Sequence, residues 1–234
     1  MSKAFIIPDI HLKPWIFDKA DTLIKVENPD YIVFLGDLVD DWGQAENIEL
    51  YNKTFDKAEE FIRKYRDKIR WCYGNHDVSY LWNKLESGFS YMAQETVVRR
   101  MKGLRELLGD DIAFIHRLDN TLFSHAGLME SFAEGVFPKR TPLNSMIVDI
   151  NHMGSVFLWD NDSPLWARPQ YDKFLIPYPK RMYQVVGHTP LRKPIKDGNL
   201  LSVDVFSMGA DGTPFGNQSF MIIDTETFAE KEVS

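Results

Sequence analysis

The stretch that decides the fold is Phe34-Leu35-Gly36-Asp37-Leu38-Val39-Asp40, which closes the apolar run 31–35. A short apolar run before a turn residue is typical of a buried strand. Gly36 lets the backbone approach closely whatever the next side chain holds. We therefore predict a strand that presents the Asp37 carboxylate at its end, and we interpret Asp37 as a bridge between two metal ions.

Two other stretches repeat this layout of a strand followed by a polar cluster. The apolar run 4–8 leads into Asp9-Ile10-His11, and the run 69–73 leads into Gly74-Asn75-His76-Asp77. Ligand sites in α/β proteins lie beyond the carboxyl ends of strands. The repetition predicts that the three clusters meet at one edge of one sheet.

Helical periodicity fills the segments between these strands. One helix follows Pro14, and a second covers 46–68, so the first third of the chain reads β-α-β-α-β. The segment 79–111 is helical in character and is interpreted as a helical cap or insertion. Its predicted buried side consists of Met92, Val97, Met101, Leu104, Leu107 and Leu108.

The second half of the chain supplies two more polar clusters after strands. A predicted hairpin of 112–115 and 121–123 leads into Ser124-His125-Ala126-Gly127, and the run 183–186 leads into Gly187-His188. The strands 183–186, 200–205 and 220–223 are expected to form a second, more antiparallel sheet.

The segment 132–143 is predicted to be a loop, and 159–179 a long irregular segment that serves function. The fold class that follows is α/β, a four-layer αββα sandwich in which two mixed β-sheets pack face to face with helices outside. We expect one domain, 1–234.

Composition limits the class of protein. The 234 residues are 44% hydrophobic, which is enough for a large core. The net charge of −7 argues against broad nucleic-acid binding. Cys72 is the single cysteine, the first residues lack the apolar region of a signal peptide, and no run is long enough to cross a membrane. These features predict a cytoplasmic protein without membrane contacts.

The side chains at the strand ends combine carboxylate, amide and imidazole groups, which suits Mn, Fe or Zn better than a soft metal. One ion would be held by Asp9, His11 and the shared Asp37. Two ions that share a carboxylate lie roughly 3.5 to 4 Å apart, a separation suited to displacement at phosphorus. The predicted ligands are Asp9, His11, Asp37, Asn75, His125 and His188, the last three with Asp37 holding the second ion.

Catalysis by such a pair needs few further groups. The ions would lower the pKa of a shared water to about 7, by analogy with zinc, and so generate a hydroxide nucleophile. His76 lies next to Asn75 and is predicted to protonate the leaving oxygen. Asp40 is predicted to hydrogen-bond that imidazole and fix its proton on the useful side.

In order and spacing, these clusters resemble those of the calcineurin-like metallophosphoesterases. Gly187-His188-Thr189-Pro190 and Leu165-Trp166-Ala167-Arg168 are similar to stretches of the bacterial and phage protein serine/threonine phosphatases. The resemblance implies a dinuclear site, often with Mn, and a phosphorylated substrate such as a phosphoprotein or a small phosphoester. It also implies that Arg168 binds phosphate oxygens, a task that suits a guanidinium fork.

One departure from the family pattern concerns the substrate. Where these phosphatases read Gly-Asp-x-Val-Asp-Arg-Gly, this chain continues with Asp41-Trp42, so an acid replaces a phosphate-binding arginine. A less charged substrate, a phosphodiester or a dinucleoside polyphosphate, is therefore an alternative to a phosphomonoester. In a further alternative, the missing positive charge is supplied from elsewhere in the chain, by Arg192 or Lys193. A third hypothesis, a binding module that keeps the fold without catalysis, is opposed by the presence of every expected ligand.

Overall fold

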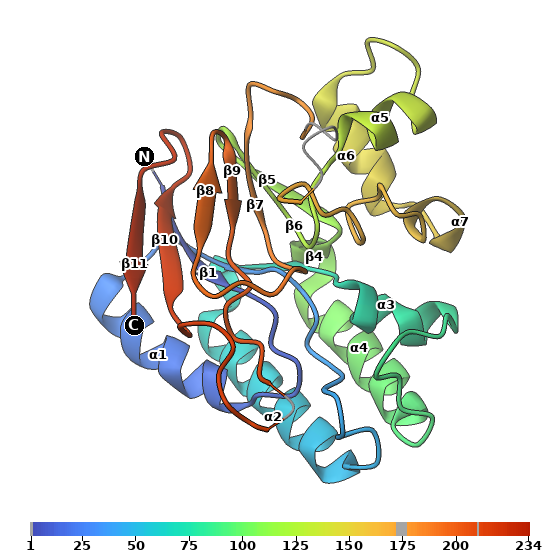
Figure 1. The fold of residues 1–234 in the computed structure, drawn as a ribbon, viewed down its shortest axis with the longest axis vertical. Coiled ribbons are helices and arrows are strands. Elements are labelled where there is room, and N and C mark those ends of the chain that lie inside the picture. Colours follow the sequence, from blue (N-terminus) through green and yellow to red (C-terminus); the bar gives the residue numbers. More distant parts are fainter. Residues whose placement is uncertain (1, 172–176, 210) are drawn as a thin grey trace.

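The computed structural model describes residues 2–171, 177–209 and 211–234, and within them two β-sheets pack together between helices (Figure 1). The first sheet has six strands in the order β11-β10-β1-β2-β3-β4, and the second has five in the order β5-β6-β7-β9-β8. Both sheets mix parallel and antiparallel pairs. The predicted fold class is confirmed.

The strands are short, and their bounds show which segments each sheet uses. The first sheet contains β1 (Lys3–Ile7), β2 (Tyr31–Phe34), β3 (Ile69–Cys72), β4 (Ile112–Ala113), β10 (Phe220–Asp224) and β11 (Glu230–Val233). The second contains β5 (Ile115–Leu118), β6 (Thr121–Ser124), β7 (Tyr183–Val186), β8 (Ile195–Asp197) and β9 (Leu200–Ser202).

Side chains of the central strands alternate between two cores. On β1, Ala4 and Ile6 belong to the apolar layer between the sheets, whereas Phe5 and Ile7 pack toward the helices. This alternation follows from the two-residue period of a strand, and burial on both faces explains why the strand sequences are almost continuously apolar. On β1 and β2, the polar residues of the site therefore follow the strand and do not interrupt it.

The helices lie outside the sheets, as Figure 1 shows, with α1, α2 and α4 along the first sheet and α6 against β5. Two short 3₁₀ turns, Arg66–Lys68 and Gly109–Asp111, precede β3 and β4. The helices are α1 (Trp15–Glu27), α2 (Ile48–Tyr65), α3 (Asn75–Trp82), α4 (Gln94–Leu108), α5 (Glu130–Val136), α6 (Leu143–Asn151) and α7 (Ser155–Leu158).

The segment 79–111 contributes the end of α3 and all of α4, and α4 packs against α2 and α3. Four predicted core residues of this segment are buried, namely Val97, Met101, Leu104 and Leu108. The prediction for Met92 is wrong: its side chain is 64% exposed. It precedes the first turn of α4, so the helical period does not extend to it.

Three sequence-based assignments of secondary structure are corrected. The run 112–115 divides at Phe114, and its first half pairs with β3 while β5 forms the hairpin with β6. The Asn151 side chain accepts the N–H groups of Phe114 and Ile115 at this crossing. The strand 220–223 belongs to the first sheet, where β10 pairs antiparallel with β1. The predicted loop 132–143 contains most of α5.

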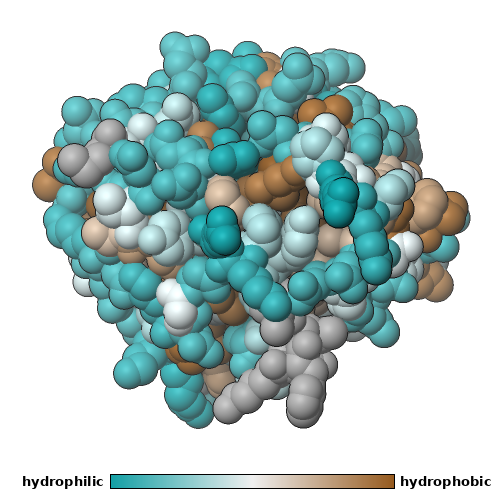
Figure 2. Space-filling model, turned by 90° about the horizontal axis from the view of Figure 1, so that it is seen from above, coloured by the Kyte–Doolittle hydropathy of each residue, from teal (hydrophilic) through white to brown (hydrophobic). Residues whose placement is uncertain are grey.

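The molecular surface agrees with the polar composition. On the face seen in Figure 2, hydrophilic residues predominate and hydrophobic residues form small separate areas. Among the described residues, none of the helices is both long and apolar enough to span a bilayer.

Buried His116 makes a testable contribution to the pH dependence of stability. Burial lowers its pKa to about 4, although its Nε2 lies 2.9 Å from the Trp71 carbonyl oxygen. The neutral form therefore stabilises the fold above the unfolded pKa of about 6.5, and this stability is lost as the pH falls toward 4. In metal-free protein, the unfolding free energy should decrease between pH 6.5 and pH 4, partly because of His116. We expect this decrease to be smaller by up to about 3 kcal/mol in His116→Gln.

Urea denaturation at several pH values measures this effect, with His152→Gln at an exposed position as the control. An unchanged pH slope in His116→Gln would show that His116 titrates alike in the folded and unfolded chain.

Candidate metal centre and active site

Five strand ends bring their polar residues to one place. Asp9, Asp37 and Asn75 follow β1, β2 and β3 of the first sheet, whereas His125 and His188 follow β6 and β7 of the second. These strands are parallel within their sheets, so their carboxyl ends lie at the same edge. The site therefore forms where the edges of the two packed sheets meet.

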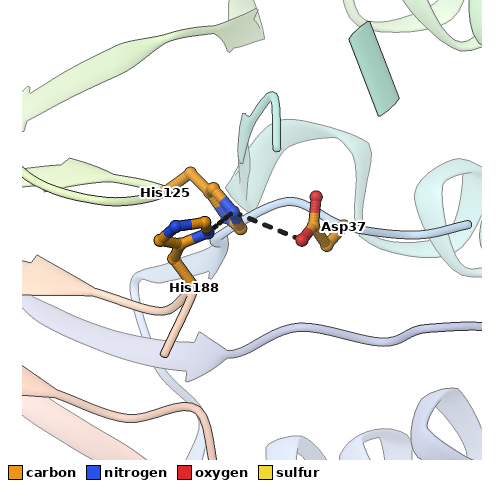
Figure 3. Close-up of side chains that lie close together, drawn as sticks. All are labelled: Asp37, His125 and His188. Atoms are coloured by element: carbon orange, nitrogen blue, oxygen red, sulfur yellow. Dashed lines mark hydrogen bonds and ion pairs between the residues drawn. The ribbon is translucent and has the colours of Figure 1, made fainter. Parts of the chain in front are cut away.

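The ligand-type atoms form two groups that share Asp37. Atoms of Asp9, His11 and Asp37 lie within 4.8 Å of one another, and so do atoms of Asp37, His125 and His188. Figure 3 shows His125 between the other two members of the second group. All five side chains are buried. This arrangement suits two cations with Asp37 between them.

His125 shows why a cation fits the second group. Its Nδ1 lies 2.7 Å from the Leu35 carbonyl oxygen, which only accepts, so Nδ1 carries the proton. In the neutral ring, Nε2 is then an acceptor. It faces Asn75 Oδ1 at 2.9 Å, Asp37 Oδ2 at 3.3 Å and His188 Nδ1 at 3.0 Å. A metal ion between these atoms satisfies lone pairs that otherwise oppose one another.

His11 repeats the pattern in the first group. Its Nδ1 lies 2.8 Å from the Asp40 carbonyl oxygen and 3.2 Å from that of Val39, and its Nε2 lies 3.6 Å from Asp37 Oδ2. The two carbonyl oxygens, by binding Nδ1–H, direct the Nε2 lone pair toward the carboxylate. Both groups fit a divalent ion bound by nitrogen and oxygen.

Two glycines permit the close approach of these loops. A Cβ atom on Gly74 would lie 2.1 Å from Asp37 Oδ1, and one on Gly187 would lie 2.0 Å from Asp9 Oδ1. The N–H of His188, the residue after Gly187, donates to the Asp9 carboxylate at 3.0 Å. Any side chain at either glycine would push a carboxylate away from the site.

Four non-glycine residues of the site have left-handed backbone conformations, with φ between 45° and 63°. Such conformations cost on the order of 1 to 3 kcal/mol each and collect at functional sites. The four are His11 (φ 45°), Asp37 (φ 50°), Asp40 (φ 63°) and His188 (φ 63°). These strained conformations occur where the polar clusters turn from the strand ends toward the site.

Asp77 joins two of the loops from within. Its carboxylate accepts the N–H groups of Asp37, Leu38 and Gly74 at 2.9 to 3.0 Å. Burial and the nearby Asp37 charge raise the pKa of Asp77 to about 7. These three N–H contacts give Asp77 a structural, capping role.

His76 and Asp40 form a buried pair beside the two groups. His76 Nδ1 lies 3.0 Å from Asp40 Oδ2, and the other carboxylate oxygen accepts the hydroxyls of Tyr51 and Tyr80. Burial lowers the pKa of His76, but the charges of Asp37 and Asp40 outweigh it and raise the pKa to about 9. His76 is thereby held in its protonated form near neutral pH, and its Nε2 is free of this pair.

The buried carboxylates repel one another without cations. Burial, then Asp204 and Asp37, raise the pKa of Asp9 well above its usual value. Burial and Asp37 likewise raise the pKa of Asp204 to about 7. Asp204 was not predicted as a site residue, although it follows β9 just as the other clusters follow their strands. The strand was expected to extend to 205, which concealed it.

Arg168 lies beside the second group. Its Nη1 donates to Thr189 Oγ1 at 2.9 Å and lies 3.4 Å from the His188 carbonyl oxygen, while the side chain remains exposed. Trp166 packs its ring edge-on at 5.7 Å from the ring of His188. Part of the predicted functional segment 159–179, residues 172–176, lies outside the described residues.

Lys13 is a buried cation beside the first group that no sequence pattern predicts. Its Nζ lies 3.2 Å from Asp41 Oδ2 and donates to the His11 carbonyl oxygen, and the side chain is buried. The acid at position 41 is therefore paired. Among the described residues, neither Arg192 nor Lys193, the two cations proposed from the sequence, forms an ion pair with Asp41.

Comparison with known proteins agrees with this geometry. Residues 2–192 match the model of the calcineurin-like phosphoesterase family. The chain belongs to this family. No curated protein matches the sequence. This calcineurin-like phosphoesterase is thus an enzyme that hydrolyses phosphoester bonds. Its family depends on a pair of metal ions, and the two groups of Asp and His side chains could bind such ions.

Solved structures similar to the chain include PPP-type phosphatases. The cold-active protein-tyrosine phosphatase of a psychrophilic Shewanella species has 13% sequence identity and a TM-score of 0.58, covering 100% of this chain and 81% of that one. A protein serine/threonine phosphatase from Saccharomyces cerevisiae, similar to human phosphatase PP5, has 13% identity and a TM-score of 0.58, with coverage of 100% and 80%. At this identity the likeness shows the fold alone.

The shared carboxylate makes a prediction about metal content. We expect wild-type protein to retain about two Mn ions per chain after reconstitution and desalting, and Asp37→Asn to retain one or fewer, because both groups then lose the anionic oxygen of their shared ligand. Saturating Mn should also raise the melting temperature of the wild type far more than that of the variant, since ions that bind the folded state stabilise it.

Elemental analysis and thermal scans measure both quantities, with Asp197→Asn at an exposed position of β8 as the control. Full Mn content in Asp37→Asn would contradict the shared ligand.

Proposed function

We propose that this protein is a two-metal phosphomonoesterase of the serine/threonine protein phosphatase type. The proposed ligands are Asp9, His11 and Asp37 for one ion, with Mn as the proposed metal. Asp37, Asn75, His125 and His188 are the proposed ligands for the other. The observation that carries the proposal is the convergence of two N/O groups on one buried carboxylate, with the hydrogen-bonded pair of His76 and Asp40 beside it.

The two ions, when bound, supply a water of lowered pKa as the nucleophile and neutralise the charge of the transferring phosphoryl group. The protein residues supply position and protons. Arg168 is proposed to bind phosphate oxygens, because its guanidinium lies beside His188 and remains exposed to a substrate. Thr189 orients it through a hydrogen bond of 2.9 Å.

His76 is proposed to protonate the leaving oxygen. The Asp40 carboxylate accepts a hydrogen bond from His76 Nδ1–H and so leaves Nε2–H as the donor to the substrate. Two tyrosine hydroxyls hold Asp40 in place. Its main-chain oxygen also accepts from His11, so the same residue links the proposed acid to a proposed ligand.

The Lys13–Asp41 ion pair bears on the choice between monoester and diester. An unpaired acid at position 41 would repel a dianionic monoester more than a monoanionic diester, which was the reason for the diester alternative. Because Lys13 lies 3.2 Å from this acid, its charge largely cancels the repulsion. The pairing favours the phosphomonoester.

Comparing p-nitrophenyl phosphate with its bis ester in Mn-loaded protein tests the substrate class. We expect the monoester to be hydrolysed with the higher kcat/KM. A higher value for the bis ester would identify the protein as a phosphodiesterase with the same site, and hydrolysis of neither ester would contradict the proposed function.

The role of His76 has a distinct kinetic signature. We expect His76→Asn to lower kcat about 100-fold or more for phenyl phosphate, whose leaving oxygen needs a proton. The loss should be smaller for p-nitrophenyl phosphate, which departs as a stable anion. Steady-state kinetics measure both, with metal content confirming that the ligands remain. An equal loss for the two substrates would indicate that His76 does not act as the acid.

A further inference from the structure

A cavity of about 170 Å³ adjoins the first metal-ligand group. His11 forms part of its wall, so the cavity and the proposed metal site share a residue. The ion pair of Lys13 and Asp41 lies on another side. Apolar and aromatic residues, Trp42, Met208 and Phe215, complete most of the lining. None of the roles discussed above uses these three residues.

Trp42 connects the cavity with the reacting groups. Its ring centroid lies 5.5 Å from that of His11 and 5.9 Å from that of His76, the latter in an edge-on arrangement. Despite these contacts, the side chain is 61% exposed. A group that leaves phosphorus and takes a proton from His76 therefore departs beside an open indole face.

The charges around the cavity favour an uncharged occupant. Lys13 and Asp41 neutralise each other at 3.2 Å, so the wall offers no net charge to a leaving group. The Arg192 guanidinium lies 5.0 Å from the centroid of the ring of Phe215, one of the lining residues. What the cavity offers is aromatic and thioether surface.

We propose that Trp42 and Phe215 form a leaving-group subsite that selects aryl phosphoesters, in which the leaving oxygen is attached to a planar ring, over alkyl phosphoesters. The proposal rests on the proposed function, since it concerns the substrate of the same site. Offset or edge-to-face packing of a ring on tryptophan adds affinity beyond the apolar area it covers. Met208 adds a sulfur contact of the kind that favours aromatic rings.

Ligand binding tests the subsite without turnover. Isothermal titration of Mn-loaded full-length protein compares phenylphosphonate with methylphosphonate, which share the anionic head and differ in the ring. We expect phenylphosphonate to bind about tenfold more tightly, the scale of one aromatic contact. Trp42→Ala should remove this advantage and leave the methylphosphonate affinity within about twofold.

Two further variants separate the possible causes. Trp42→Leu keeps apolar volume without an aromatic face and should retain only part of the preference. Phe157→Ala removes an exposed aromatic side chain on α7 and should retain all of it. Equal affinity of the wild type for both phosphonates, or equal weakening of both in Trp42→Ala, would overturn the proposal.

Turnover gives the second reading. The ratio of kcat/KM for a phosphotyrosine peptide to that for a phosphoserine peptide of the same sequence should fall about tenfold in Trp42→Ala, mostly through the phosphotyrosine peptide. An unchanged ratio, with both peptides hydrolysed, would overturn the aryl subsite and leave the phosphomonoesterase intact. Failure to bind either phosphonate would overturn both.

Discussion

The structure of the site depends on the buried carboxylate of Asp37. Its Oδ1 accepts the N–H of His76, and its Oδ2 lies within 3.6 Å of His11 Nε2 and 3.3 Å of His125 Nε2. Its own N–H donates to Asp77. Groups that follow three other strands of the two sheets, β1, β3 and β6, are therefore organised around one negative charge. A buried charge of this kind is costly unless it is paired, and histidines fixed by carbonyl oxygens cannot all donate to it. Cations bound between these groups would remove the conflict. The arrangement is therefore the one expected of a metal centre.

Much of this could be predicted from the sequence because the informative pattern is local. A polar cluster directly after an apolar run marks the end of a buried strand, and Asp9, Asp37 and Asn75 each follow such a run. What could not be predicted depends on long-range pairing. The choice of β10 to pair with β1, and the division of 112–115 between two sheets, are decided by contacts between segments far apart in sequence. A periodicity of two identifies a strand but not its neighbour.

Two site residues escaped prediction for different physical reasons. Asp204 obeys the strand-end pattern, but β9 ends at Ser202, earlier than its apolar run suggested. Lys13 obeys no pattern, because lysine is almost never fully buried unless it is paired, and its partner Asp41 lies 28 positions away. From the sequence alone, Asp41 therefore reads as an acid that replaces an arginine and leaves that positive charge missing. In the structure, Lys13 and Asp41 form an ion pair without net charge. The adjacent Trp42 lies beside His76.

The backbone of the site shows how function and stability are linked. Left-handed conformations at His11, Asp37, Asp40 and His188 each cost on the order of 1 to 3 kcal/mol, a sum comparable with the whole stability of a typical domain, about 5 to 15 kcal/mol. The clustered carboxylates add repulsion. Ligands that bind only the folded state contribute about 4 kcal/mol when present at a thousand times their dissociation constant. Metal ions would therefore offset much of the strain that positions their own ligands. Asp41 and Trp42 contact this set through Lys13, His11 and His76 but are not among the proposed ligands, so substitutions there would change the contacts to substrate without removing a group that holds an ion.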